Sequence, residues 1–115
     1  MEFVNRVHLT GIIGQVRVSK IGGTQYARVS LSTQYAFKKD GSLLIESTWH
    51  SLTIFQSEKT CDLSLLEKGK ALKVVGRIRN QRFTGTDGSE RTSTEILVSE
   101  CSLIEGHLVL ETSGL

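Results

Sequence analysis

Residues Glu46–Phe55, ESTWHSLTIF, contain the only tryptophan of the chain. Successive side chains of an extended strand point to opposite faces. Leu52 and Ile54 then share one face, which suits a buried core. Trp49 and Phe55 share the other face with serines and threonines. The stretch therefore predicts a β-strand that turns two large aromatic side chains toward solvent.

The neighbouring segments show the same period of two, bounded by turn-forming residues. A first strand is expected over 7–18, where Gly11 and Gly14 suggest a bend or bulge. A second strand over 27–32 follows a turn at Gly22–Gly23, and a Lys39–Gly41 turn joins it to the quoted strand as a hairpin. Two further strands are expected, over 71–83 and 92–99, on either side of an Asp87–Gly88 turn.

Between the third and fourth strands, Ser57–Lys68 break the alternation and follow helical spacing, and Gly69 suits a helix end. We therefore expect one short helix there. Three strands, a helix and two strands are the element order of an OB-fold, a five-stranded, partly open Greek-key barrel. The sequence predicts an all-β protein of this class.

The composition indicates a single small domain of 115 residues. No apolar run is long enough to cross a bilayer and no secretory signal begins the chain, so we expect a cytoplasmic protein. Cys61 and Cys101 are too few and too far apart in sequence for a disulfide framework or a metal motif, and we expect reduced packing residues. The three histidines, His8, His50 and His107, are scattered, and no Cys/His spacing fits zinc. No nucleophile elbow or phosphate-binding loop appears either, so neither an enzyme nor a bound metal or cofactor is expected.

The net charge of +2 hides an uneven distribution. Seven basic and two acidic residues lie between Lys68 and Arg91, whereas the segment from Glu95 onward holds four glutamates and no lysine or arginine. In the fourth predicted strand, the basic residues share a face with Phe83. An ordinary solvated face is the alternative interpretation of this basic segment.

Exposed aromatic rings among cations suit a ligand that has flat bases joined by negative phosphates. Bases stack on aromatic side chains at about 1–3 kcal/mol each, and phosphates pair with lysine and arginine. Duplex DNA hides its base faces, so this pattern predicts single-strand binding with little sequence preference. RNA stays an alternative ligand because stacking does not sense the 2′-OH. Burial of the rings in an oligomer interface or under a loop is the structural alternative.

Five stretches resemble the bacterial single-stranded DNA-binding protein (SSB) family in order and spacing: NRVHLTGIIGQ, ARVSLST, ESTWHSLTIF, LEKGKALKVVGRIRNQRF and DGSERTSTEI. The resemblance covers roughly Asn5–Ile104. It implies an OB-fold that assembles as a homotetramer and wraps single-stranded DNA in replication, repair and recombination. It also implies an OB domain over 1–104. The short segment that follows, 105–115, departs from the family because it lacks the acidic tip that recruits replication proteins. Recruitment of partners through such a tail is therefore not expected, and the chain is either a short variant or a trimmed core domain.

The resemblance also implies roles for individual residues. It places base-stacking aromatics at Phe37, Trp49, Phe55 and Phe83, although Phe37 and Phe83 stand where the family usually has tryptophan. It places His50 near a subunit contact. The cations expected to contact nucleic acid are Arg6, Lys38, Lys68, Lys73, Arg77, Arg79, Arg82 and Arg91. Lys73 and Arg77 rest on strand alternation more than on resemblance, and Lys38 lies in a hairpin tip that resembles a DNA-clasping loop.

Two other binding functions fit the same pattern. One is a primosomal replication-restart accessory protein of the PriB type, a dimeric OB domain without a tail. The other is an OB-fold protein-interaction module whose aromatics form an interface core. Native mass separates the dimer from the tetramer, and salt-sensitive oligonucleotide binding separates both from the interaction module.

Overall fold

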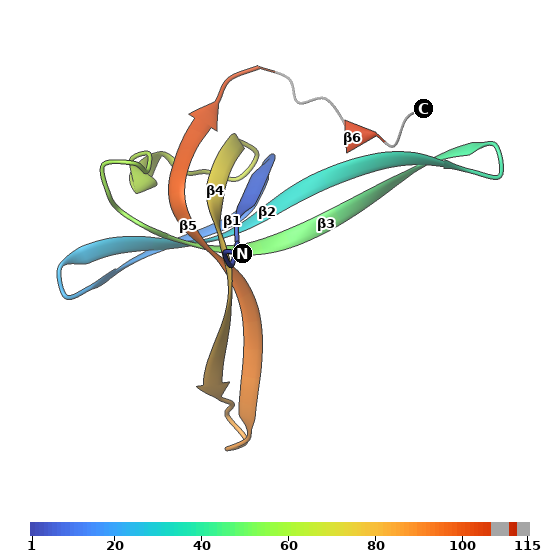
Figure 1. Ribbon diagram of the computed structural model, residues 1–115. Helices are drawn as coiled ribbons and strands as arrows, with labels where there is room; N and C mark the ends of the chain where they lie inside the picture. The colour runs from blue at the N-terminus through green and yellow to red at the C-terminus, as the bar shows by residue number, and fades with distance from the viewer. Residues whose placement is uncertain (107–110, 113–115) are drawn as a thin grey trace.

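The computed structural model describes residues 1–106 and the backbone of 111–112 (Figure 1). His107 and most of the predicted segment 105–115 therefore lie outside the described residues. The strands are β1 (Val7–Ile21), β2 (Thr24–Lys39), β3 (Ser42–Phe55), β4 (Ala71–Thr84), β5 (Glu90–Ile104) and the short β6 (Glu111–Thr112). The five long strands occur where the sequence predicts them, but each extends further. Within the described part of the chain, no helix is long and apolar enough to cross a membrane.

The five long strands close into a barrel. β1 pairs with β2 and β4, β3 pairs with β2 and β5, and β4 pairs with β5, so each strand has two neighbours. The β3–β5 seam is parallel and is the shortest, with Leu52, Thr53 and Ile54 opposite Ile96, Leu97 and Val98. The predicted OB-fold barrel is confirmed.

Two hairpin turns fix the registers that place the outer side chains. Gly22 and Gly23 have φ values of 56° and 84°, and Asp40 and Gly41 have φ values of 52° and 80°. Two consecutive residues with positive φ are the requirement of a type I′ turn, for which Gly-Gly and Asp-Gly are favoured sequences. The β2–β3 ladder then runs without a shift from Lys39–Ser42 to Tyr26–Phe55.

A bulge interrupts β1. Its register with β2 shifts between Ile13 and Gln15, so Gly14 is the extra residue. This confirms the irregularity predicted in the first strand and bends β1 so that it can pair with β2 along one half and with β4 along the other.

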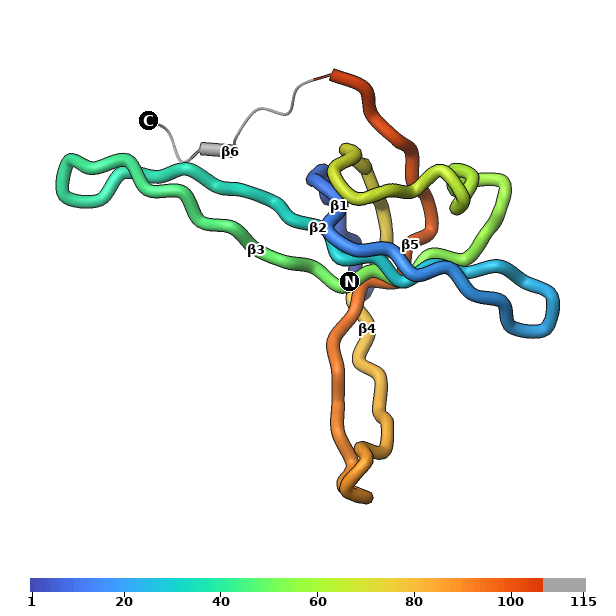
Figure 2. Tube along the Cα trace, turned by 180° about the vertical axis from the view of Figure 1, so that it is seen from behind, coloured from blue at the N-terminus to red at the C-terminus, as the bar shows by residue number. Residues whose placement is uncertain are grey.

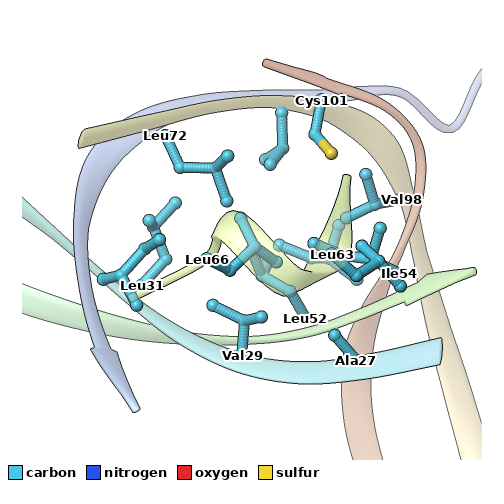
Figure 3. Close-up of a cluster of buried hydrophobic side chains, with 13 residues drawn as sticks. Ala27, Val29, Leu31, Leu52, Ile54, Leu63, Leu66, Leu72, Val98 and Cys101 are labelled. Carbon is cyan, nitrogen blue, oxygen red and sulfur yellow. The ribbon is translucent and has the colours of Figure 1, made fainter. Parts of the chain in front are cut away.

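The barrel interior is filled by alternate residues of the strands (Figure 3). Val29, Leu31, Leu52 and Ile54 are buried there, as period-two patterning predicts. Leu63 and Leu66 enter the same cluster from the connection between β3 and β4. Burying a leucine side chain contributes about 1.5–3 kcal/mol. The connection is therefore held by apolar packing.

The helix expected over Ser57–Lys68 is only a single 3₁₀ turn, η1 (Leu63–Leu65). The side chain of Gln56 explains why a longer helix does not form. Its Oε1 accepts a hydrogen bond from the Leu63 N–H at 3.1 Å, and its Nε2 donates to the Cys61 carbonyl at 3.2 Å. These backbone groups have side-chain partners in place of helical ones. The apolar residues of this connection, Leu63 and Leu66, therefore pack into the barrel interior and do not form one face of a helix.

Three hairpins extend beyond the barrel: β1–β2, β2–β3 and β4–β5 (Figures 1 and 2). The radius of gyration is 16.3 Å, whereas a compact domain of this length has about 13 Å. The tip of the β2–β3 hairpin carries Lys38 and the exposed apolar residues Leu43, Leu44 and Ile45. The hairpins therefore give a small barrel a large outer surface.

Candidate nucleic-acid interface

The outward face of the β2–β3 ladder carries the two aromatic side chains that the sequence predicts to face solvent, Trp49 and Phe55. Trp49 is 62% exposed and Phe55 is 39% exposed, while Leu52 and Ile54 between them are buried. Tyr26 lies opposite Phe55 in the register, so it shares the same face. The prediction that this strand presents Trp49 and Phe55 outward is confirmed.

Trp49 lies against the bulge of β1. A methyl group built on Gly14 would overlap the Cζ3 and Cη2 atoms of the Trp49 ring and would lie 3.0 Å from Ser30 Oγ. Ser30 Oγ is itself held because it accepts a hydrogen bond from the Gln15 N–H at 2.9 Å. The missing side chain of Gly14 therefore makes room for an exposed ring at a defined position.

Tyr26 and Phe55 form an aromatic pair, with ring centroids 5.8 Å apart and an angle of 35° between the ring planes. Such tilted pairs are favourable by about 0.5–1.5 kcal/mol beyond their buried area. Phe55 is therefore supported from one side while part of it stays open to solvent.

Arginines from neighbouring strands lie between these aromatics. Arg17 of β1 is opposite Arg28 of β2, and Arg28 is opposite Thr53 of β3. A shallow hollow joins them and is lined also by Glu95 of β5. Arg79 of β4 reaches the same carboxylate. We call this surface the outer stripe and define it by Arg17, Tyr26, Arg28, Trp49, Phe55 and Arg79.

Glu95 is the acidic residue of the hollow in the outer stripe. Thr53 Oγ1 donates a hydrogen bond to Glu95 Oε2 at 2.6 Å, and Arg79 Nε donates to Oε1 at 3.0 Å. Burial raises the pKa of Glu95, but these hydrogen bonds and the charges of Arg79 and Arg28 outweigh it and hold the pKa below its ordinary value. The carboxylate therefore stays ionised and orients Arg79.

Phe83 lies further along the β4–β5 hairpin and is 48% exposed. The register places it opposite Arg91, on the ladder face that also carries Arg77 and Arg79. Arg91 makes an ion pair of 3.3 Å with Asp87, and both side chains are largely exposed. Surface pairs of this kind contribute little. Arg91 is therefore available beside Phe83.

Two predicted residues lie on the other faces of their ladders. Phe37 is opposite Leu44, so it shares the ladder face of Leu52 and not that of Trp49, and its ring lies 6.5 Å from that of Tyr35. Arg82 is opposite Thr92 and alternates with Phe83. The structure does not bring Phe37 or Arg82 onto the ladder faces of Trp49 and Phe83.

Arg6 and Arg77 meet at the N-terminal segment. The Asn5 side chain donates from Nδ2 to the Ile78 carbonyl at 2.7 Å and accepts from the Ile78 N–H at 3.0 Å. This clamp fixes the segment along β4, where Arg6 and Arg77 line one hollow. The pair adjoins Arg79 along the strand, although it is separate from the outer stripe.

The predicted lysines are dispersed. Lys73 is exposed on β4 between Thr10 and Ser102, Lys68 lies in the β3–β4 connection, and Lys38 lies in the β2–β3 hairpin. None of these three lines the hollow of the outer stripe.

His50 lies on the ladder face opposite to that of Trp49 and is half-buried. Its Nε2 is 2.8 Å from Thr33 Oγ1, within hydrogen-bonding distance. Burial lowers the pKa of His50 below the ordinary value for histidine. The neutral imidazole is therefore favoured at neutral pH.

Sequence reasoning missed Arg17, Tyr26 and Arg28. A signal for two of them was present, because the Asp40–Gly41 turn sets the pairing of the hairpin and puts Tyr26 and Arg28 beside the outward residues of β3. Arg17 could not be placed in this way, because the Gly14 bulge had to be located and its register known first.

The chain is similar over most of its length to curated single-stranded DNA-binding proteins. A single-stranded DNA-binding protein from Xylella fastidiosa (strain Temecula1) is 34% identical over 106 residues, covering 90% of this chain and 65% of that protein. A single-stranded DNA-binding protein from Xanthomonas axonopodis pv. citri is 32% identical over 106 residues, covering 90% of this chain and 59% of that protein. The chain thus spans less than two thirds of the length of these curated relatives.

Two solved structures share the fold. The Plasmodium falciparum SSB in complex with ssDNA superimposes with a TM-score of 0.70 at 20% identity, covering 90% of this chain and 96% of that chain. A deletion mutant of the single-stranded DNA binding protein from Thermus aquaticus gives a TM-score of 0.72 at 21% identity, covering 90% of this chain and 51% of that chain. The model of the Single-strand binding protein family matches residues 4–104. The chain therefore belongs to the single-strand binding protein family.

Proposed function

We propose that this protein binds single-stranded DNA with little sequence preference, without catalysing a reaction on it. The observation that carries the proposal is the exposure of Trp49 and Phe55 on one ladder face, with Arg28 between them in the register and Arg17 opposite Arg28. The relatives named single-stranded DNA-binding proteins support it, and so does the fold shared with an SSB in complex with ssDNA.

The two chemical parts of the ligand are recognised by different residues of the outer stripe. Trp49 and Phe55 provide ring faces for bases, at about 1–3 kcal/mol for each stacked base. Arg17 and Arg28 are opposite each other and provide charge for phosphates. Every base has a π-face, so this arrangement favours an unpaired strand over a particular sequence.

The strand is proposed to continue from the outer stripe along the β4–β5 hairpin. Phe83 and Arg91 repeat the combination of an exposed ring and a cation there. Six other cations stay predicted contacts, and only a strand that wraps around the barrel could reach all of them: Arg6, Lys38, Lys68, Lys73, Arg77 and Arg82. Phe37 also stays a predicted stacking residue, because a wrapped strand could reach the ladder face on which it lies.

The same proposal includes a role in DNA replication, repair and recombination in the cytoplasm. This part of the proposal is inferred from membership of the single-strand binding protein family. A homotetramer is also proposed, with His50 near a subunit contact. A native mass of four chains supports the tetramer. A mass of two chains would instead favour the dimeric replication-restart type.

The test is a binding titration of fluorescently labelled oligo(dT) by the intact protein and by Trp49→Ala. Leu65→Ala serves as a matched control, since Leu65 is also a large exposed apolar residue but lies on η1. Trp49→Ala is expected to weaken binding by about 1–3 kcal/mol, and Leu65→Ala is expected to leave it unchanged.

Salt and duplex competitors complete the test. Binding should weaken with rising salt, with a slope of log affinity against log salt of about −0.7 for each phosphate neutralised. A duplex of equal length should compete poorly. Equal affinity for the duplex, or affinity that does not depend on salt, would overturn the proposal and favour the protein-interaction module.

A further inference from the structure

The two cysteines of the chain meet in the folded structure although 40 residues separate them in sequence. Cys61 Sγ and Cys101 Sγ are 3.5 Å apart. Cys61 lies in the β3–β4 connection, and Cys101 lies in β5 with its side chain in the hydrophobic cluster (Figure 3). The expectation of reduced packing residues therefore describes only part of what this pair can do.

A backbone hydrogen bond holds the two segments against each other while both thiols are free. The Cys101 N–H donates to the Lys59 carbonyl at 3.1 Å, two residues before Cys61. Gln56 Nε2 donates to the Cys61 carbonyl at 3.2 Å. The Lys59 bond thus joins the connection to β5 beside the thiol contact, and the Gln56 bond lies within the connection. The ladder of β5 with β4 fixes Cys101 opposite Val74.

We propose that Cys61 and Cys101 form a site of reversible oxidation, at which a disulfide joins the β3–β4 connection to β5. A disulfide has an S–S distance of about 2.05 Å, so the sulfurs must approach by about 1.5 Å from their present contact. Cys61 can supply this movement because it lies outside the strands, where no ladder fixes its backbone.

The two thiols have different parts in the reaction. Cys61 is partly exposed, whereas Cys101 is buried. Burial raises the pKa of Cys101 to about 12, which leaves Cys61 as the better source of an attacking thiolate.

The oxidant is a small disulfide such as oxidised glutathione. The Cys61 thiolate attacks one of its sulfurs, forms a mixed disulfide and releases one glutathione thiolate. Cys101 then loses its proton and attacks Cys61 Sγ, which forms the protein disulfide and releases the second glutathione. Two protein thiols are oxidised by two electrons, and oxidised glutathione is reduced to two thiols.

The crosslink would close a ring of residues 61–101, which contains β4 and most of β5. A crosslink of this kind restricts the conformations of the unfolded chain, which stabilises the folded state. The resulting rise in Tm should be about 5–15 °C. Trp49 lies on the outward ladder face, away from the cluster that holds Cys101. The modification therefore acts on the stability of the barrel and not on the outer stripe.

The test treats the reduced, intact chain with oxidised glutathione, then traps free thiols with N-ethylmaleimide and measures the intact mass. The expected product has lost two hydrogen masses, carries no adduct and remains a single chain on a non-reducing denaturing gel. Trypsin should then yield a disulfide-linked pair of peptides, 60–68 and 92–115. The rise in Tm should disappear when dithiothreitol is added.

Two variants separate this reaction from ordinary thiol chemistry. Cys61→Ser should show no rise in Tm with oxidised glutathione. The Cys101 thiol of this variant should react with oxidised glutathione at least about tenfold more slowly than the Cys61 thiol of Cys101→Ala does. Two maleimide adducts on the treated wild-type chain would overturn the proposal, as would a persistent glutathione adduct on Cys61 or a disulfide between chains.

Discussion

Gly14 leaves the space in which the ring of Trp49 lies: a β-carbon at Gly14 would overlap two atoms of the six-membered ring. Gly14 is also the extra residue of the β1 bulge. The same glycine therefore bends the strand and seats the exposed aromatic side chain. This relationship links the curvature of the barrel to the position of the proposed stacking surface.

Gly14→Ala should displace the Trp49 ring without unfolding the protein, because Trp49 is largely exposed and can move. We expect oligo(dT) binding to weaken by about 1 kcal/mol or more, since stacking depends on the position of the ring. Fluorescence anisotropy of a labelled oligonucleotide measures the loss, and circular dichroism checks the fold. An affinity equal to that of the wild type would show that Gly14 does not position the ring.

Arg28→Ala should reduce the steepness of the salt dependence. Loss of one phosphate contact changes the slope of log affinity against log salt by about 0.7. Lys70→Ala is a matched control, since the Lys70 ammonium donates to the Leu65 carbonyl at 2.9 Å in the β3–β4 connection. If the two variants have equal slopes, Arg28 does not contact phosphate.

Phe55→Ala and Phe37→Ala compare the two faces of the β2–β3 ladder. Phe55 lies on the face of Trp49, whereas Phe37 lies on the other face. Phe55→Ala should weaken oligo(dT) binding by about 1–3 kcal/mol, and Phe37→Ala should weaken it less. Equal losses in the same titration would mean that the strand contacts both faces of this hairpin.

Glu95→Gln should destabilise the protein at neutral pH by about 1–3 kcal/mol, because the carboxylate is buried and accepts hydrogen bonds from Thr53 and Arg79. The pKa of Glu95 is held below its ordinary value of 4.5, so the ionised form stabilises the folded state above that pH. This contribution is lost as the pH falls through the folded-state pKa.

Urea denaturation of wild type and Glu95→Gln across the acidic range tests this linkage. The difference in unfolding free energy between the two proteins should be largest above pH 4.5 and should shrink below it. A difference that stays constant with pH would rule out a stabilising carboxylate at this position.

Much of the fold could be predicted from local sequence because strand alternation and turn chemistry act over a few residues. Asp40–Gly41 and Gly22–Gly23 specify type I′ turns, and Leu52 and Ile54 specify the buried face of β3. The helix prediction failed because helical spacing in the β3–β4 connection arises from residues that close the barrel. The bonds from the Gln56 side chain that replace the helix could not be inferred from that spacing.

The candidate site was predicted only in part, since it depends on contacts between distant segments. Glu95 counts as part of an acidic C-terminal segment in the sequence, yet in the fold it joins Thr53 and Arg79. The charge of a segment therefore does not give the charge of a surface. The Cys61–Cys101 contact was also hidden, because only the fold brings the connection against β5.

The most direct test of single-strand stacking is the intrinsic fluorescence of Trp49, the only tryptophan of the chain. Titration with oligo(dT) should quench it to saturation, high salt should restore it, and a duplex of equal length should leave it nearly unchanged. If the emission of Trp49 does not change while the oligonucleotide is bound, or if the duplex quenches it equally, stacking of unpaired bases on Trp49 is contradicted.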